Sequence, residues 1–533
     1  MTRTILYGTA AVAAVALAVL LYGSLSGPAP SLDGAVSTGS APRIRPDCSG
    51  VTLPPNIAPL NFVVEEPGER YAVRIRSHGG EPISIHSDDP SIIIPAGAWR
   101  RLLEANRGQE LVVEVAIQTS KGAWHRFLPL TARIAAEPID RYLVYRLIRP
   151  IYNKYKRIGI YQRDLEGYGE SAILKNAAFG HGCVNCHTFC PKDPSRMVLH
   201  VRSPFGAAMV LVRDGRVAKV DTRTGLSRSP AAYSSWHPSG RLLAFSMNEL
   251  SQMFHTVGEN RDVFDARSDL GLYLVDSNTV TTTDAISLPD RNETWPAWSA
   301  DGRHLYFSAA PRMPKERFRE VRYDLMRIGY DADTDSWGNL ETLVAAEDTG
   351  RTSVEPRPSP DGRWLLFAMC DYGSFPIYQP SCDLYLRDLA TGEDRPLACN
   401  SPRCDSYHSW SSNSRWIVFT SKRRDGVFAQ PYFSYIDADG RAHKPFVLPQ
   451  RDPTFYDSCL KTYNAPELSP APVAVPRREF GRVIRTPEPD EDFKAMLDPR
   501  IPPRVSPTAE PPWKPTEPYE QGGQRRGTEH PGG

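Results

Sequence analysis

The sequence lacks an excess of charge of either sign. Its 533 residues include 63 Lys and Arg against 62 Asp and Glu, so the formal net charge is +1. A protein that binds nucleic acid mainly through phosphate contacts needs a surplus of basic residues. We therefore predict no nucleic-acid partner.

Familiar catalytic motifs are missing as well. The sequence contains no convincing Ser/His/Asp arrangement, no phosphate-binding loop and no paired-carboxylate signature. His408 in SYHSW and the neighbouring Asp405 resemble part of a hydrolase site, but no nucleophile elbow accompanies them. A hydrogen-bonding role in a turn explains these two residues better, and the absences favour a carrier or a subunit over a stand-alone enzyme.

Long apolar runs are absent except near the N-terminus. Residues 5–23, ILYGTAAVAAVALAVLLYG, carry no charge and have about the length of a helix that crosses a bilayer. We predict a membrane anchor or a cleaved signal over residues 1–24, then a linker over 25–49. The rest of the chain is then expected in the periplasm, held at the inner membrane by the N-terminal segment.

One repeat organises the second half of the chain. SWHPSGRLLAFS (235–246), AWSADGRHLYFS (297–308), RPSPDGRWLLFA (357–368) and SWSSNSRWIVFT (409–420) align without gaps. Each copy has a turn, then an Arg, then apolar residues that alternate with a period of two, as in a strand with a buried face. Repeats of 52 to 62 residues with several strands each are typical of propeller blades.

These copies resemble the TolB-like group of β-propellers, whose blades carry a Trp-Ser-Pro-Asp-Gly-Lys/Arg turn before an apolar strand. Two copies depart from that pattern, because Pro358 replaces the Trp and Ser414 replaces the Gly. Four copies and a degenerate blade around residues 198–220 predict five blades over 197–465, with six as the alternative.

The remaining segments give a mainly β chain. Short alternating strand patterns over 50–136 predict a β-sandwich. IDRYLVYRLI and ESAILKNAAF predict a short helical segment over 137–196 that leads to a cysteine cluster. Residues 466–533 are rich in Pro and poor in apolar residues, so we expect a disordered tail.

HGCVNCHTFC (181–190) contains Cys-x-x-Cys-His, the attachment signal for c-type haem. Two thiols bond to the haem vinyl groups, and the next imidazole ligates the iron. We predict one covalent haem c on Cys183 and Cys186, with His187 as the proximal iron ligand. Two alternatives stay open: a redox pair of the thioredoxin type, and zinc bound by His181, Cys183, Cys186 and either His187 or Cys190.

A six-coordinate iron needs a second axial ligand. His200 is our first candidate and Met197 the next, because both follow the motif closely enough to reach the far side of a haem. His255 is a weaker candidate. Arg146 and Arg149, in the basic and aromatic stretch before the motif, are predicted to pair with the haem propionates.

Cysteines outside the motif suggest disulfides in an exported chain. Cys370, Cys382, Cys399 and Cys404 flank neighbouring propeller connections, and the sequence does not choose among their three possible pairings.

From about residue 137 to 466, the chain resembles bacterial cell-envelope proteins that combine a TolB-like propeller with one c-type haem. The resemblance implies a membrane-anchored periplasmic cytochrome that transfers electrons between redox proteins or within an envelope complex. A scaffold protein with a structural or sensory haem, and a haem enzyme with an open distal site, are the alternatives.

Overall fold

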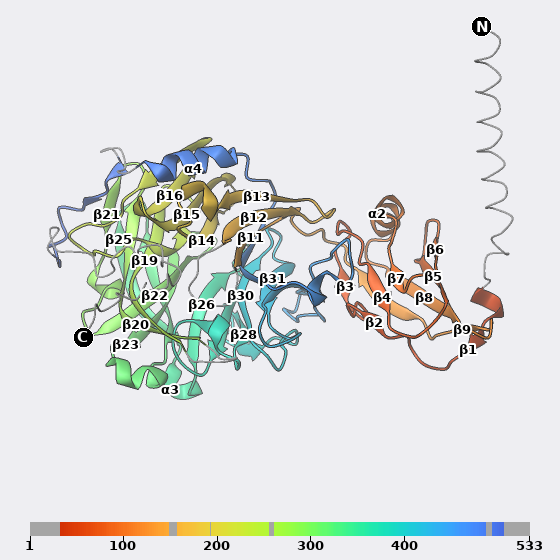
Figure 1. Cartoon of the computed structure of the whole chain (residues 1–533). Helices are drawn as coiled ribbons and strands as arrows, with labels where there is room; N and C mark the ends of the chain where they lie inside the picture. The colour runs from red at the N-terminus through yellow and green to blue at the C-terminus, as the bar shows by residue number, and fades with distance from the viewer. Residues whose placement is uncertain (1–31, 149–156, 192, 255–260, 487–492, 506–533) are drawn as a thin grey trace, which may run out of the picture.

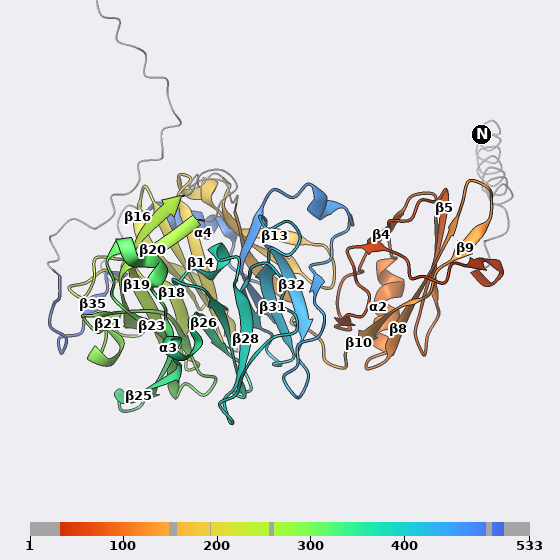
Figure 2. The ribbon, with the colours of Figure 1, turned by 90° about the horizontal axis from the view of Figure 1, so that it is seen from below.

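The computed structural model describes residues 32–148, 157–191, 193–254, 261–486 and 493–505. Strands dominate, and two parts follow one another along the chain (Figure 1). The first part ends near residue 135. The second contains six antiparallel sheets, which Figure 2 shows from below.

The N-terminal part combines two sheets with one helix. Strands β1 (Val36–Ser37), β3 (Thr52–Leu53), β5 (Arg70–Arg76), β6 (Ile83–Ser87), β8 (Glu110–Gln118), β9 (Trp124–Arg126) and β10 (Leu130–Ile134) form a seven-stranded sheet. Strands β2 (Ile44–Arg45), β4 (Phe62–Val64) and β7 (Ser91–Ile92) form the second sheet. Helix α2 (Ala96–Ala105) buries Trp99, Leu102 and Leu103 in the same core. The simple sandwich predicted for 50–136 is therefore not confirmed, although its strands are present.

Six sheets, called blades 1 to 6 here, make up the second part. Blade 1 contains β34 (Thr462–Ser469), β11 (Tyr142–Ile148), β12 (Gly159–Asp164) and β13 (Glu170–Lys175); blade 2 contains β14 (Cys183–Cys190), β15 (Asp193–Ser203), β16 (Gly206–Arg213) and β17 (Arg216–Val220). Blade 3 contains β18 (Ala232–Trp236), β19 (Leu242–Phe254), β20 (Arg261–Leu274) and β21 (Thr279–Thr281), and β35 (Met496–Leu497) joins its edge.

Blades 4 to 6 follow the same plan. Blade 4 contains β22 (Arg291–Trp298), β23 (His304–Pro311), β24 (Asp324–Asp331) and β25 (Ser336–Val344); blade 5 contains β26 (Thr352–Pro358), β27 (Trp364–Cys370), β28 (Asp383–Asp388) and β29 (Asp394–Pro396). Blade 6 contains β30 (Asp405–Trp410), β31 (Trp416–Ser421), β32 (Gln430–Tyr435) and β33 (Phe446–Val447). The first strand of each blade contacts the first strand of the next, and β34 contacts both β30 and β14. The inner strands thus close a ring around a central channel, so the structure has six blades rather than five.

The repeat explains why these strands form. In β19, β23, β27 and β31 the conserved spacing of apolar residues places Leu243, Leu305, Leu365 and Ile417 at 0% exposure. The turn before each strand needs a left-handed residue, which Gly240, Gly302 and Gly362 supply with φ between 67° and 76°. Ser414 replaces the glycine in the last copy and still has φ 60°.

The helical segment predicted over 137–196 is wrong. IDRYLVYRLI forms β11, and ESAILK forms β13, so this segment builds blade 1. Leu143 and Leu147 have helical spacing, but β11 lies between β34 and β12 with both faces covered, and it therefore lacks the alternation of a half-exposed strand. The haem motif itself lies in strand β14.

The disordered tail predicted from residue 466 is also wrong over much of its length. Strand β34 provides the inner strand of blade 1 and closes the ring. Helix α4 (Arg477–Arg485) then buries Phe480 and Ile484 in the core between blades 1 and 2, and it runs along the top of the propeller in Figure 1. The chain continues to β35 on blade 3. Residues 506–533 lie outside the described part.

Short helical turns complete the element list: α3 (Ala346–Thr349), η1 (Leu32–Gly34), η2 (Asn176–Phe179), η3 (Asp284–Ile286), η4 (Lys315–Glu320), η5 (Pro376–Tyr378) and η6 (Phe455–Asp457).

Two further predictions need correction. No helix in the described ranges is long and apolar enough to cross a membrane. The predicted anchor at residues 1–24 lies outside the described residues, so the expected localisation at the inner membrane is not upheld. The described residues include all nine cysteines, and each of these has a free thiol, so none of the predicted disulfides is formed.

Candidate functional site

The six inner strands share one irregularity, which shapes the channel. In each strand the pairing register shifts at the same place, and two residues bulge out of the ladder. The first bulged residue has a positive φ in five strands: Tyr233, Trp295, Glu355, Tyr407 and Ala465. In β14 the bulged residues are Asn185 and Cys186. The motif therefore occupies the place where every blade bends its inner strand at the channel.

The residues that follow the bulges line the channel together. One residue comes from each inner strand: His187, Ser235, Ala297, Arg357, Ser409 and Glu467. They border a cavity with an empty volume of about 1520 Å³, part of which is open to solvent. The channel of the propeller thus forms a cavity beside the motif, and His187 lines it.

His187 is the most unusual residue of the site. Its ring is fully enclosed, and apart from a contact with the Val144 backbone neither ring nitrogen has a hydrogen-bond partner among the described residues. The nearest carboxylate oxygen, Oε2 of Glu467, lies 3.9 Å from Nε2. Burial lowers the pKa of His187 to about 4, so the ring is neutral at pH 7. A buried neutral imidazole that donates from one ring nitrogen to a backbone carbonyl leaves the lone pair of the other nitrogen free, as a metal ligand requires.

Cys183 and Cys186 flank the site with free thiols. Cys183 is buried, and its Sγ lies 3.8 Å from Nη2 of Arg146 on β11. Cys186 lines a smaller cavity of about 340 Å³ together with His187, Tyr233 and Tyr407. Burial raises the pKa of the Cys186 thiol, while the nearby Arg146 charge opposes that rise.

Arg146 places a positive charge beside both thiols without an anion to balance it. Among the described residues no carboxylate forms an ion pair with Arg146, and its Nε is buried without a hydrogen-bond acceptor. An unpaired buried charge is costly, so such a guanidinium favours an anionic partner. The structure therefore brings Arg146 to the motif, and its predicted pairing with a haem propionate stays a prediction, whereas Arg149 lies outside the described residues.

The predicted second ligands fall into different surroundings. His200 lies on β15 and lines the smaller cavity, where its Nε2 is 3.0 Å from Oγ of Ser234. Burial lowers the pKa of His200 to about 3. Met197 is 1% exposed in the core between blades 1 and 2, and it is not among the residues that line either cavity. His255 lies outside the described residues.

Two carboxylates in the channel, Glu355 and Glu467, were not predicted from the sequence. Burial raises the pKa of Glu355 and that of Glu467 to about 7, with Arg357 opposing both shifts. Glu355 accepts a hydrogen bond from the backbone N–H of Tyr407 at 3.0 Å, and Glu467 accepts one from Phe189 at 3.0 Å. Glu355 lies two positions before the copy at 357–368, so extending that alignment upstream was the available signal, whereas Glu467 lies on β34, after the last copy, where the repeat gives no signal.

The zinc alternative receives no support from the geometry. No group of three or more His, Cys, Asp or Glu side chains in the described ranges is arranged to hold a metal ion. The redox-pair alternative also lacks its usual setting, because Cys183 and Cys186 lie in a strand and do not open a helix.

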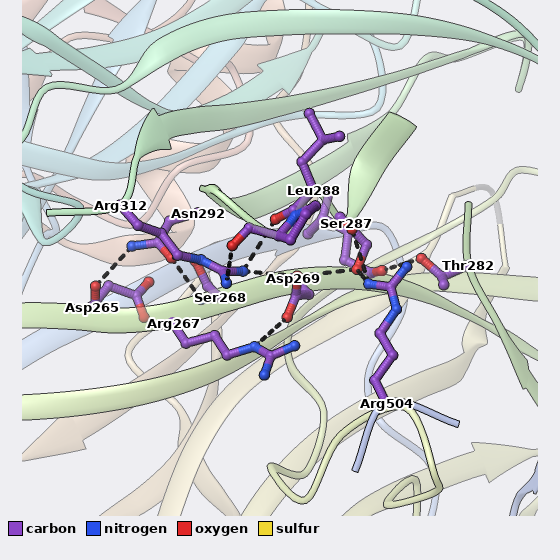
Figure 3. Close-up of polar contacts among 12 residues, drawn as sticks. Asp265, Arg267, Ser268, Asp269, Thr282, Ser287, Leu288, Asn292, Arg312 and Arg504 are labelled. Atoms are coloured by element: carbon purple, nitrogen blue, oxygen red, sulfur yellow. Dashed lines mark hydrogen bonds and ion pairs between the residues drawn. The ribbon is translucent and has the colours of Figure 1, made fainter. Parts of the chain in front are cut away.

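A second buried polar network lies away from the channel, between blades 3 and 4 (Figure 3). Arg312 donates hydrogen bonds to Asp269 and Asn292, at 3.1 and 3.2 Å. Arg504, from the C-terminal segment, donates to the Ser287 carbonyl at 2.9 Å. Burial raises the pKa of Asp265 to about 7. These contacts tie the C-terminal segment to blade 3 and contribute no residue to the haem motif.

Comparison with known proteins gives neighbours by fold only. No protein-family model matches the chain, and no curated protein matches it. TolB from Acinetobacter baumannii is 15% identical over 70% of this chain and 85% of that one, with a TM-score of 0.40. A putative TolB from Agrobacterium tumefaciens is 16% identical over 62% and 99%, with a TM-score of 0.35. Hydrazine synthase from Kuenenia stuttgartiensis is 14% identical over 49% and 65%, with a TM-score of 0.30. These neighbours include TolB-like β-propeller proteins, and similarities of this size say nothing about activity.

Proposed function

We propose that this chain is a monohaem c-type cytochrome whose haem is held in the channel of a β-propeller and transfers single electrons. One observation carries the proposal: His187 is enclosed and neutral, its ring contacts only the Val144 backbone among the described hydrogen-bonding groups, and it lies beside two free thiols in the spacing of the haem attachment signal. The residues present fit the group.

Each residue has a distinct role in this proposal. Cys183 and Cys186 form the two thioether bonds, and His187 ligates the iron. The bound haem supplies a one-electron couple. Arg146, 3.8 Å from the Cys183 sulfur, would place a positive charge at the edge of the haem that the cysteines hold. Of the predicted second ligands, His200 is the residue that lines the cavity beside the motif.

The propeller sets the surroundings of the redox group. The inner strands of all six blades enclose the chamber, so the chain controls how much water reaches it. A closed ring of sheets also presents broad faces on which a redox partner protein can dock. Electron transfer between two such partners is the activity that these features support best.

Haem content tests the proposal directly. Full-length chain made together with a haem-attachment system should give a pyridine haemochrome spectrum of covalent haem c, at one haem per chain. The Cys183→Ser/Cys186→Ser double variant should fold and lack covalent haem, whereas Cys459→Ser, which removes a thiol from outside the channel, should keep it. A colourless wild-type protein would sink the proposal.

A second function is favoured by the chemistry of the chamber. Polar and apolar side chains of all six inner strands line the chamber, and burial raises the pKa of Glu355 and that of Glu467 to about 7, which suits groups that accept or donate protons near neutral pH. Both features suit a haem enzyme with an open distal site. Carbon monoxide added to the reduced protein separates the two functions: an unchanged spectrum supports electron transfer, and a shifted Soret band supports the enzyme.

A further inference from the structure

Three of the cysteines that the haem site does not use lie together in the core between blades 5 and 6. Cys370 ends β27, Cys382 precedes β28, and Cys404 precedes β30. Each is at most 3% exposed. The Cys382 thiol lies within hydrogen-bonding distance of the thiols of both Cys370 and Cys404. Cys399 belongs to the same core but not to this trio of thiols.

The strand register places Cys370 and Cys382 at a separation that a disulfide can span. Met369 pairs with Asp383 across β27 and β28, so Cys370 lies directly opposite Cys382 at the next step of the ladder. Opposed residues of an antiparallel pair have Cα atoms roughly 4.5 to 5.5 Å apart, and disulfides span roughly 4.4 to 6.8 Å. The backbone therefore needs no rearrangement to join them.

Cys382 and Cys404, the second pair, come from neighbouring blades, blade 5 and blade 6. The backbone N–H of Asp405, at the start of β30, donates to the carbonyl of Cys382 at 2.9 Å, and the Cys382 Sγ lies 3.0 Å from the Asp405 carbonyl. These contacts hold Cys404 beside Cys382. A hydrogen bond from Cys382, together with the charge of Lys422, lowers the pKa of the Cys404 thiol, while burial raises that of Cys382. Cys404 is thus a better leaving group than Cys382 when a bond between the two is broken.

The loop between Cys370 and Cys382, called the floor loop here, packs against residues that line the smaller cavity. Its Ser374 carbonyl accepts a hydrogen bond from Nε1 of Trp295 at 2.9 Å, and the Phe375 ring lies 6.1 Å from the Tyr233 ring. The Cys404 Sγ lies 3.3 Å from the Pro376 carbonyl of the same loop. Any bond made by Cys382 therefore fixes one end of the floor loop.

We infer that Cys370, Cys382 and Cys404 form a thiol–disulfide site, in which Cys382 bonds either to Cys404, joining blades 5 and 6, or to Cys370, closing the base of the floor loop. In the oxidation, a small-molecule disulfide accepts two electrons and two protons from the Cys382 and Cys404 thiols and leaves as two thiols. In the exchange, the Cys370 thiolate attacks Cys382 Sγ, the S–S bond to Cys404 breaks, and Cys404 leaves as the thiolate. The site does not depend on haem.

Alkylation and peptide mass spectrometry test the site on the full chain. After incubation with glutathione disulfide, the wild type should carry one disulfide within the trio, with Cys399 free. Cys370→Ser should retain only the 382–404 bond and Cys404→Ser only the 370–382 bond. Cys382→Ser should lose at least nine-tenths of the disulfide, while Cys399→Ser, the matched buried control, should behave as wild type.

Two results would overturn the inference: a wild-type chain whose trio stays reduced, or a Cys382→Ser chain that forms a disulfide in this region as fast as the wild type. Thermal melting of each variant checks that it folds. Hydrogen exchange provides a separate measurement, since residues 371–381 should exchange more slowly in the oxidised wild type and at an unchanged rate in Cys382→Ser.

Discussion

Replacing Arg146 with glutamine should lower the midpoint potential of the haem-loaded protein by roughly 70 mV. The guanidinium lies 3.8 Å from the Cys183 sulfur, which is one of the two attachment points, and has no carboxylate partner among the described residues. Its charge therefore acts on the group attached at Cys183. Removing a positive charge stabilises the ferric state, which carries one more positive charge than the ferrous state, and so lowers the potential.

The magnitude follows from Coulomb's law. For a charge within roughly 10 Å of the iron at an effective dielectric constant of about 20, the interaction is about 1.7 kcal/mol. For a one-electron couple this corresponds to roughly 70 mV.

Spectroelectrochemical titration measures the effect. Arg146→Lys should stay closer to wild type, because the charge remains while the planar fork is lost. Arg216→Gln, which removes an exposed charge from the outer strand β17, is the matched control and should change the potential by no more than about 10 mV, since solvent and salt screen it. Equal potentials for Arg146→Gln and Arg216→Gln, or a rise in the first, would refute the reasoning.

Three further predictions concern stability. Burial raises the pKa of Glu355 from 4.5 to about 7, so the folded state holds a proton that the unfolded state has lost, and stability falls by about 3 kcal/mol as the pH rises through that window. Glu355→Gln should lose this part of the pH dependence in thermal melts between pH 4.5 and 7.5, and a slope equal to that of the wild type would contradict it. Ala465 has a φ of 45°, so Ala465→Gly should leave the free energy of unfolding unchanged or raise it by up to about 1 kcal/mol. The control Ala208→Gly, in the middle of β16, should lower it by about 1 kcal/mol. Equal losses in urea unfolding would argue against strain at the bulge. Leu468→Ala in the closing strand β34 should cost about 2 to 5 kcal/mol, against about 0.5 kcal/mol for Leu340→Ala at a half-exposed position, and a small loss at Leu468 would mean that β34 is not needed for closure.

The repeated hairpins were predictable because their evidence is local. A turn residue with positive φ, followed by apolar residues at every second position, produces the same structure in each copy, and even Ser414 follows the rule. The nearness of Arg146 to the cysteines was suggested by its position in a basic stretch that precedes them. Its lack of a carboxylate partner did not, since pairing depends on side chains from other strands.

Blade 1 was mistaken for a helical segment because its defining partner is distant. Its inner strand, β34, lies more than 300 residues after β11 in the sequence, so no hairpin turn marks the pair. Both faces of β11 are covered, which removes the alternation that identifies a strand. The same closure explains why residues 462–469 were assigned to the end of the propeller and a disordered tail.

The sequence by itself determined the strand-forming repeat and the Cys-x-x-Cys-His spacing, because both depend on neighbours within a dozen residues. Only the tertiary structure decided that the motif lies on an inner strand, that Glu355, Arg357 and Glu467 share its channel, and that Cys382 contacts two other thiols. These residues are far apart in the sequence, and they meet because the ring closes through a strand from the C-terminal part of the chain.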